Sequence, residues 1–355
     1  MSTAELTREV ESVVAKEILV SADSHINEPH DMWEKGLPAS LRDKAPKFAP
    51  RQGGGVGQKP GGHDSKARLE EMAVDGVTAE VLYPTLGLRL YAMENAEAQE
   101  ACFRIANDWL IDYCRVAPDR LVGIPMISMF NLDNAIKELE RCKKEGMKGC
   151  LIWQVPPEKL AFSTDYYEPF WEAAQDMDMP VNLHILTGFN YSRFLGTRKG
   201  IEAFRGSVNL KLADAANALF EIVFSGVLER YPRLKFVLVE NEMGWIPFYL
   251  HEWDKYYKRH SPRNPISLTK LPSEYVNKQV YATFFSDPTG GHLLDWWGAD
   301  TCMWSNDYPH PASTWPKSRQ VIAEELGHLP QNVLRKVLRE NVIRLYNLKI
   351  PGVNV

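Results

Sequence analysis

Short apolar runs alternate with longer amphipathic segments along most of the chain. Continuous apolar runs of this kind are typical of strands that are buried on both faces of a parallel sheet. The pattern predicts eight strands, at 17–23, 79–84, 121–127, 149–153, 180–185, 235–240, 279–285 and 300–307.

The segments between these runs carry apolar residues at helical spacing. Asn131 and Gly146 have the residue types that begin and end a helix, so we expect a helix between them. Further helices are predicted over 95–118, 166–180, 210–232 and 313–330.

Strands that alternate with helices predict an α/β chain built from parallel β/α units. The simplest closed arrangement is a (β/α)8 TIM barrel, which typically needs about 250 residues. A doubly wound open sheet is the alternative. Because the chain has 355 residues, we expect one domain over 1–355 with an inserted loop or lid at 27–68 and a C-terminal helix and tail at 330–355. The glycine-rich stretch 53–62 lacks the ending of a phosphate loop, and we expect a mobile surface loop there.

Composition narrows the class of partner. The formal net charge is −5, from 41 basic and 46 acidic residues, which gives no basic field for nucleic acid or an anionic membrane. No apolar run approaches the roughly 20 residues that a membrane helix needs. The five cysteines form no CxxC pair, and residues 4–17 do not have the pattern of a signal peptide. These features predict a cytoplasmic protein that acts on a small molecule.

Residues that bind metals stand at the carboxyl ends of four predicted strands. In a (β/α)8 barrel these ends meet on one face, where active sites lie. A mononuclear catalytic metal needs about three protein ligands and an open position for water or substrate. The sequence therefore predicts a metal site made by Asp23, His25, His184, Glu240 and Asp307.

The roles of two of these residues stay open. Asp307 is either a ligand or the general base on a metal-bound water. Glu240 is an extra ligand that permits a second ion, a general acid or base, or only a charge partner for a neighbouring group.

Other residues near the predicted strand ends are candidates for substrate contacts. His310 follows Asp307 by three residues and is expected to touch substrate or to orient that aspartate. Arg89 is a candidate for binding a substrate carboxylate. Glu28 is expected to support His25, and Asn182 is expected on the same side of its strand as His184.

Five stretches resemble the amidohydrolase-related family that contains aminocarboxymuconate-semialdehyde decarboxylase and the resorcylate-type decarboxylases. They are "SADSHINEPHDMW", "NDWL", "VNLHIL", "FSGVLERYPRLKFVLVENEMGWIP" and "WSNDYPHPASTWP", in family order along the chain. The resemblance implies a (β/α)8 barrel with a divalent metal, commonly zinc or manganese, and it suggests a homodimer. It also implies that Asp23 and His25 stand at the family's His/Glu-x-His pair, with His184 and Asp307 at its other ligand positions.

Two departures from that family pattern affect the expected reaction. Asp23 adds a carboxylate to the ligand set, which favours manganese or iron over zinc. Glu240 stands where the decarboxylases carry a strand-six histidine. We therefore expect a metal-dependent hydrolase in which metal-activated water attacks an ester, thioester, amide or lactone carbonyl. Non-oxidative decarboxylation of an aromatic or unsaturated acid is the alternative.

Overall fold

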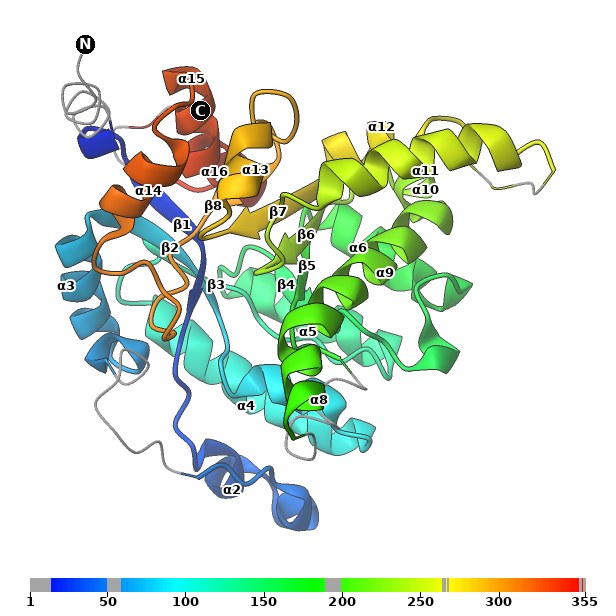
Figure 1. The fold of residues 1–355 in the computed structure, drawn as a ribbon. Coiled ribbons are helices and arrows are strands. Elements are labelled where there is room, and N and C mark those ends of the chain that lie inside the picture. The colour runs from blue at the N-terminus through cyan, green and yellow to red at the C-terminus, as the bar shows by residue number, and fades with distance from the viewer. Residues whose placement is uncertain are drawn as a thin grey trace.

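Eight parallel strands form the centre of the molecule, and helices surround them (Figure 1). This is a computed structural model, and it describes residues 14–49, 59–188, 199–263, 266, 268–350 and 353. Within these residues the strands are β1 (Leu19–His25), β2 (Val77–Tyr83), β3 (Leu121–Gly123), β4 (Cys150–Ile152), β5 (Val181–His184), β6 (Phe236–Val239), β7 (Val280–Phe284) and β8 (Cys302–Trp304).

Helices fill the connections between the strands. The α-helices are α2 (Met32–Gly36), α3 (Ser65–Asp75), α4 (Ala96–Cys114), α5 (Leu132–Lys144), α6 (Glu168–Asp176), α8 (Ile201–Phe204), α9 (Lys211–Phe224), α10 (Val227–Arg230), α11 (Ile246–His260), α12 (Pro272–Gln279), α13 (Pro288–Leu293), α14 (Ser318–Leu326), α15 (Gln331–Arg335) and α16 (Asn341–Tyr346). Two π-helical turns, η7 (Arg205–Leu210) and η8 (Lys336–Glu340), precede α9 and α16. Short 3-10 turns are η1 (Ala39–Lys44), η3 (Pro60–Gly62), η4 (Gly87–Ala92), η5 (Glu158–Leu160) and η6 (Asp165–Tyr167).

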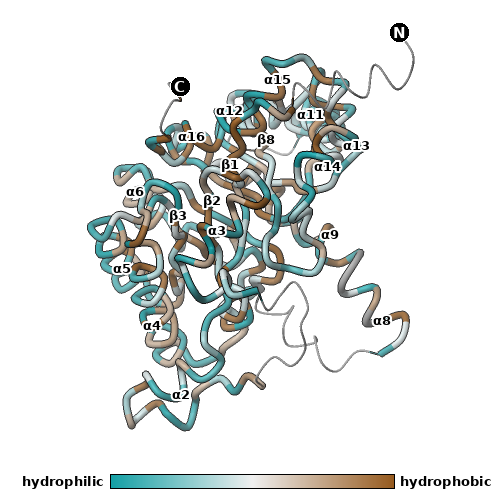
Figure 2. The backbone as a smooth tube through the Cα atoms, turned by 90° about the vertical axis from the view of Figure 1, so that its left-hand side faces the viewer, coloured by the Kyte–Doolittle hydropathy of each residue, from teal (hydrophilic) through white to brown (hydrophobic). Residues whose placement is uncertain are grey.

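All eight predicted strands are present, and the parallel barrel arrangement is confirmed. Ladders of hydrogen bonds join β1, β2 and β3 in one group and β4 through β8 in another. Every residue of β6 is buried, as a strand covered on both faces should be. Figure 2 shows the hydrophobic positions gathered in the strands and the hydrophilic positions on the outer helices.

Local sequence signals explain several element boundaries. Asn131 caps α5 by accepting a hydrogen bond from the Asn134 N–H, and Gly146 follows the helix with φ +93°. The helix predicted over 210–232 is divided, because Gly226 adopts φ +78° between α9 and α10. Within the part of the chain described, no helix is long and apolar enough to cross a membrane.

The regions expected to be insertions contain short helical elements. Residues 27–68 include α2, η1 and η3, and much of the glycine-rich stretch 53–62 lies outside the described residues. The C-terminal region contributes α16, whose Tyr346 is buried. The five cysteines are all buried and free.

Candidate metal centre

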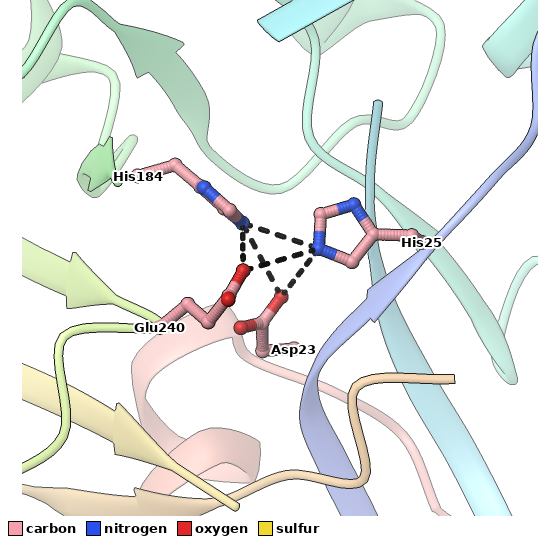
Figure 3. A group of neighbouring side chains, drawn as sticks. All are labelled: Asp23, His25, His184 and Glu240. Carbon is pink, nitrogen blue, oxygen red and sulfur yellow. Dashed lines mark hydrogen bonds and ion pairs between the residues drawn. The ribbon is translucent and has the colours of Figure 1, made fainter. Parts of the chain in front are cut away.

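Four side chains converge from three strand ends at the carboxyl face of the barrel (Figure 3). Asp23 and His25 belong to β1, His184 ends β5, and Glu240 follows β6. The Nε2 atom of His25 lies 3.2 Å from Nε2 of His184 and 3.6 Å from Oδ1 of Asp23. The Nε2 atom of His184 lies 3.8 Å from Oδ1 of Asp23 and 3.6 Å from Oε2 of Glu240. These separations bring four potential ligand atoms around one point.

Backbone carbonyls fix the orientation of both histidines. Nδ1 of His25 lies 2.8 Å from the carbonyl oxygen of Pro84, and Nδ1 of His184 lies 2.8 Å from that of Ile185. Because a carbonyl only accepts, Nδ1 carries the proton in each ring, and each Nε2 presents a lone pair to the centre. Burial lowers the pKa of His25 well below its ordinary value and lowers the pKa of His184 to about 3. Both rings are therefore neutral and suited to bind a cation.

The carboxylates of the cluster lack the partners that buried charges require. Within the described residues, both side-chain oxygens of Asp23 are buried without a hydrogen bond of good geometry, and the nearby Thr283 hydroxyl only partly offsets the rise in the pKa of Asp23. Burial and the nearby carboxylates of Asp307, Glu240 and Glu242 raise the pKa of Asp23 well above its ordinary value. Burial and Asp307 likewise raise the pKa of Glu240 to about 8. An isolated buried carboxylate is costly unless a cation compensates it.

The donor set fits a divalent metal ion. Ligand atoms held about 2.1 Å from one ion lie roughly 3–3.5 Å apart. The observed separations of 3.2–3.9 Å between these atoms are near that range. Two imidazole nitrogens and two carboxylates provide both neutral ligands and negative charge.

Asp307 and His310 form a pair beside this cluster. Oδ1 of Asp307 lies 3.5 Å from Nε2 of His25 and 2.8 Å from Nδ1 of His310. The His310 ring packs against the His25 ring with centroids 3.9 Å apart, and its Nε2 lies 3.3 Å from the hydroxyl of Thr85. Asp307 is buried, whereas the side chain of His310 is 20% exposed. The pair therefore connects the buried ligands to the accessible side of the site.

Unusual backbone conformations occur at this face of the barrel. Glu240, Glu242 and Asp307 have φ values of +56°, +54° and +51°, which non-glycine residues adopt rarely. The Glu240 N–H donates to the hydroxyl of Thr283 at 2.8 Å, which helps to hold that turn. Such conformations concentrate at functional sites, where the surrounding structure holds them.

The structure shows the surroundings of the predicted substrate contacts Arg89, Glu28 and Asn182. Arg89 is exposed on η4. The carboxylate of Glu28 accepts the N–H groups of Thr85, Leu86 and Gly87, so it anchors the loop after β2 and does not bond His25.

Asn182 is buried on β5, two residues before His184. Its side-chain oxygen accepts the hydroxyls of Tyr83 and Tyr346, and its nitrogen donates to two backbone carbonyls. The Tyr83 ring lies 5.4 Å from the His184 ring, so this network supports the site from below. All hydrogen-bonding positions of the Asn182 amide are engaged within the protein.

Two charged residues near the site were not identified from the sequence. Glu242 has a buried, unpartnered oxygen, and burial together with Asp287 raises its pKa to about 8. Lys211 begins α9, and its charge offsets a small part of the rise in the pKa values of Glu240 and Glu242 and adds slightly to the fall in that of His184. The "ENE" sequence after the sixth strand was a signal for Glu242, whereas no local signal singled out Lys211.

A family model described as amidohydrolase matches residues 22–348. The chain belongs to the amidohydrolase family. This assignment confirms the resemblance seen in the sequence and places the group of potential metal ligands in an enzyme superfamily.

Relatives of this amidohydrolase include gamma-resorcylate decarboxylases. The enzyme from Polaromonas sp. is 26% identical over 227 residues, which cover 61% of this chain and 68% of the relative. The enzyme from Rhizobium sp. is 25% identical over 267 residues, which cover 69% of this chain and 76% of the relative.

Solved structures share the fold. An amidohydrolase from Mycobacterium avium subsp. paratuberculosis has a TM-score of 0.77 at 19% identity, covering 93% of this chain and 99% of that one. The 5-carboxyvanillate decarboxylase from Sphingomonas paucimobilis has a TM-score of 0.71 at 21% identity, with 94% and 99% covered. A dihydroxybenzoic acid decarboxylase from Polaromonas sp., with bound manganese and 2-nitroresorcinol, has a TM-score of 0.70 at 19% identity, with 94% and 97% covered.

The expected hydrolase activity is wrong. The similar curated proteins include gamma-resorcylate decarboxylases, and the similar structures include further decarboxylases of aromatic acids. The expectation rested on Glu240 in place of a strand-six histidine. The structure gives Glu240 a place among the potential metal ligands, so its presence does not indicate a change of reaction.

Proposed function

We propose that this amidohydrolase is a metal-dependent, non-oxidative decarboxylase of an aromatic or unsaturated carboxylic acid. One observation carries the proposal. The group of potential metal ligands lies next to Asp307 and His310, a hydrogen-bonded pair that can hold and donate a proton. Its decarboxylase relatives support the same reaction class.

We propose one manganese ion held by Asp23, His25, His184 and Glu240. Carboxylate oxygens suit Mn²⁺ better than they suit Zn²⁺, and two similar decarboxylases contain manganese. The two overlapping groups of potential ligands share His25 and Glu240, which favours one ion over two. When bound, the ion would bind the substrate's oxygen atoms and draw electron density from them.

Asp307 and His310 would supply the proton that this reaction requires. Loss of carbon dioxide breaks a carbon–carbon bond and leaves its electron pair on the substrate carbon, which must then receive one proton. His310 is bonded to Asp307 at 2.8 Å and is partly exposed, so it is placed to deliver that proton. General acid catalysis by a positioned histidine contributes about 10²–10⁴-fold.

Lys211 supports a negatively charged substrate. Within the described residues it has no hydrogen bond or ion pair, and it is half-buried where it influences Glu240 and His184. We propose that its ammonium attracts the substrate carboxylate.

The test combines metal analysis with product analysis. Protein loaded with one equivalent of Mn²⁺ is incubated in D₂O with a panel of hydroxybenzoates, including 2,6-dihydroxybenzoate and 5-carboxyvanillate. We expect carbon dioxide release and one deuteron on the product carbon, both lost after chelation. Turnover of matched esters without carbon dioxide release from any acid would overturn the proposal.

Several expectations from the sequence remain predictions. They are a homodimer, a cytoplasmic location, and one domain over 1–355 with a lid at 27–68 and a C-terminal tail at 330–355. Gel filtration with light scattering tests the dimer directly.

A further inference from the structure

The ends of β1 and β8 meet at a place where the barrel lacks a ladder of hydrogen bonds. Within the described residues, β8 pairs only with β7, and β1 pairs only with β2. Two backbone hydrogen bonds cross between them instead. The Asp307 N–H donates to the Asp23 carbonyl at 3.1 Å, and the His25 N–H donates to the Tyr308 carbonyl at 2.6 Å. We call this contact the β8/β1 seam.

The seam joins residues of the site itself. Asp23 and His25 lie on one side of it, and Asp307 lies on the other. The distance between His25 and Asp307 therefore depends on how the seam is closed. Two backbone hydrogen bonds provide less restraint than a continuous ladder, so side chains also help to fix this spacing, among them Asn306, whose bonds with Ser21 and Ser24 cross the same seam.

Arg68 of α3 reaches both sides of the β8/β1 seam. Its Nη1 donates to the carbonyl oxygen of His25 at 2.8 Å, and its Nη2 donates to that of Tyr308 at 3.3 Å. The guanidinium also lies 4.5 Å from the centre of the Tyr308 ring. One planar group thus holds the backbone of a ligand and the residue after Asp307.

The environment of Arg68 restricts it to this position. The side chain is fully buried, and its Nε donates to Oε2 of Glu80 on β2 at 2.5 Å. Glu80 in turn lies 3.4 Å from the side chain of Asn306, which bonds Ser21 and Ser24 of β1. Arginine presents several donors in a rigid plane, whereas lysine presents one compact charge.

We propose that Arg68 is a positioning residue that sets the spacing between the β1 ligands and Asp307 by holding the carbonyls of His25 and Tyr308. Its hydrogen bonds go to Glu80 and to backbone carbonyls, and within the described residues none goes to the side chain of a candidate ligand. The inference rests on the proposed metal site, but it assigns a role to a residue that lies outside that site.

The test compares Arg68→Lys with a matched control, Arg319→Lys. Arg319 also donates to three backbone carbonyls, those of Val14, Glu17 and Gly76, but these lie away from the ligands. Each purified variant is loaded with Mn²⁺, and its metal affinity and electron paramagnetic resonance spectrum are measured together with its melting temperature.

We expect Arg68→Lys to weaken Mn²⁺ binding by about 10–100-fold, a typical effect of losing an outer-shell contact, and to change the spectrum. Arg319→Lys should lower the melting temperature while its affinity and spectrum match those of the wild type. A wild-type affinity and spectrum in Arg68→Lys, or equal changes in both variants, would overturn the inference.

A second variant covers the case in which Arg68→Lys does not fold. Glu80→Gln keeps the shape of the partner but removes its charge, so Arg68 is held less firmly. We expect a smaller change of the same spectrum, and an unchanged spectrum and affinity would contradict the proposal. Neither readout requires turnover, so failure of the proposed decarboxylation would be recognised separately.

Discussion

The barrel is interrupted at two places, and the two are closed by different chemistry. At the β3/β4 seam, Met126 forms a single bridge with Leu151, and both residues are buried and apolar. The Asn107 side chain bonds both backbone groups of Met126, and the Tyr91 hydroxyl donates to the Leu151 carbonyl at 2.6 Å. Neutral groups thus satisfy the backbone there.

The β8/β1 seam uses charged groups and leaves some of them uncompensated. Arg68 and Glu80 are paired, but the oxygens of Asp23 have no hydrogen-bond partner among the residues that the structure describes. Both seams join neighbouring strands that are not linked by a ladder of hydrogen bonds. Of the two, the β8/β1 seam holds buried carboxyl groups that need a proton or a cation, and by this difference we propose it as the functional junction.

The largest expected effect comes from removing the uncompensated charge. Asp23→Asn should abolish stoichiometric Mn²⁺ binding and with it decarboxylation, because it removes a charged ligand. The metal-free variant should be at least as stable as the metal-free wild type, since Asn needs neither the proton nor the cation that the buried Asp23 carboxyl group requires. Elemental analysis and urea unfolding measure both effects.

Asn107→Ala is the matched change at the β3/β4 seam. It leaves the N–H and carbonyl of Met126 unpaired and should cost about 2–4 kcal/mol of unfolding free energy. Its Mn²⁺ affinity should equal that of the wild type. If Asn107→Ala lost the metal, or Asp23→Asn kept it, the proposed division between the two seams would be wrong.

A smaller effect is expected at His310. His310→Gln should lower kcat by about 10²–10³-fold, because the proposed proton donor is lost, while Mn²⁺ affinity changes little. Thr85→Val removes only the contact at 3.3 Å from Nε2 and should change kcat much less. Steady-state kinetics with metal titration separates the two. An unaltered kcat in His310→Gln would assign the proton to another group.

The sequence predicted the fold well because its signals are local. Each β-strand is a short apolar run, and caps such as Asn131 lie next to the helices that they begin. The boundaries were less certain where a single residue decides them. Pro125 lacks an N–H and lies just beyond Gly123, where the third strand ends short of the predicted 127.

The candidate ligands could also be predicted from the sequence, because the carboxyl ends of barrel strands lie on one face. Asp23, His25, His184 and Glu240 all follow that rule. Arg68 and Lys211 were not, since each acts from a helix across a tertiary contact that no local pattern encodes. Asn182 shows another limit of the sequence. The alternation along a strand predicts which side Asn182 faces, but not that its amide is already hydrogen-bonded within the protein.

The smallest expected effect is the number of protons released when Mn²⁺ binds. It should depend on the carboxyl groups at the β8/β1 seam and not on changes at the β3/β4 seam. In the metal-free protein the pKa of Glu240 is raised from 4.5 to about 8, and that of Glu242 is also raised to about 8. The folded state therefore holds protons that the unfolded state has lost. This contribution to stability is complete below about pH 4.5 and is lost as the pH rises to about 8.

Metal binding should reverse that proton uptake. At pH 7 a bound ion must displace the proton of Glu240 and that of Asp23, whose pKa is also raised, so Mn²⁺ affinity should increase as the pH rises towards the pKa of Glu240 at about 8. Calorimetry in two buffers of different ionisation enthalpy should show one to two protons released per ion, and Asn107→Ala should release the same number. Because the pKa of His184 is lowered to about 3, its imidazole should contribute none. Binding without proton release would mean that the carboxylates are already ionised, and that a cation from the protein compensates them instead.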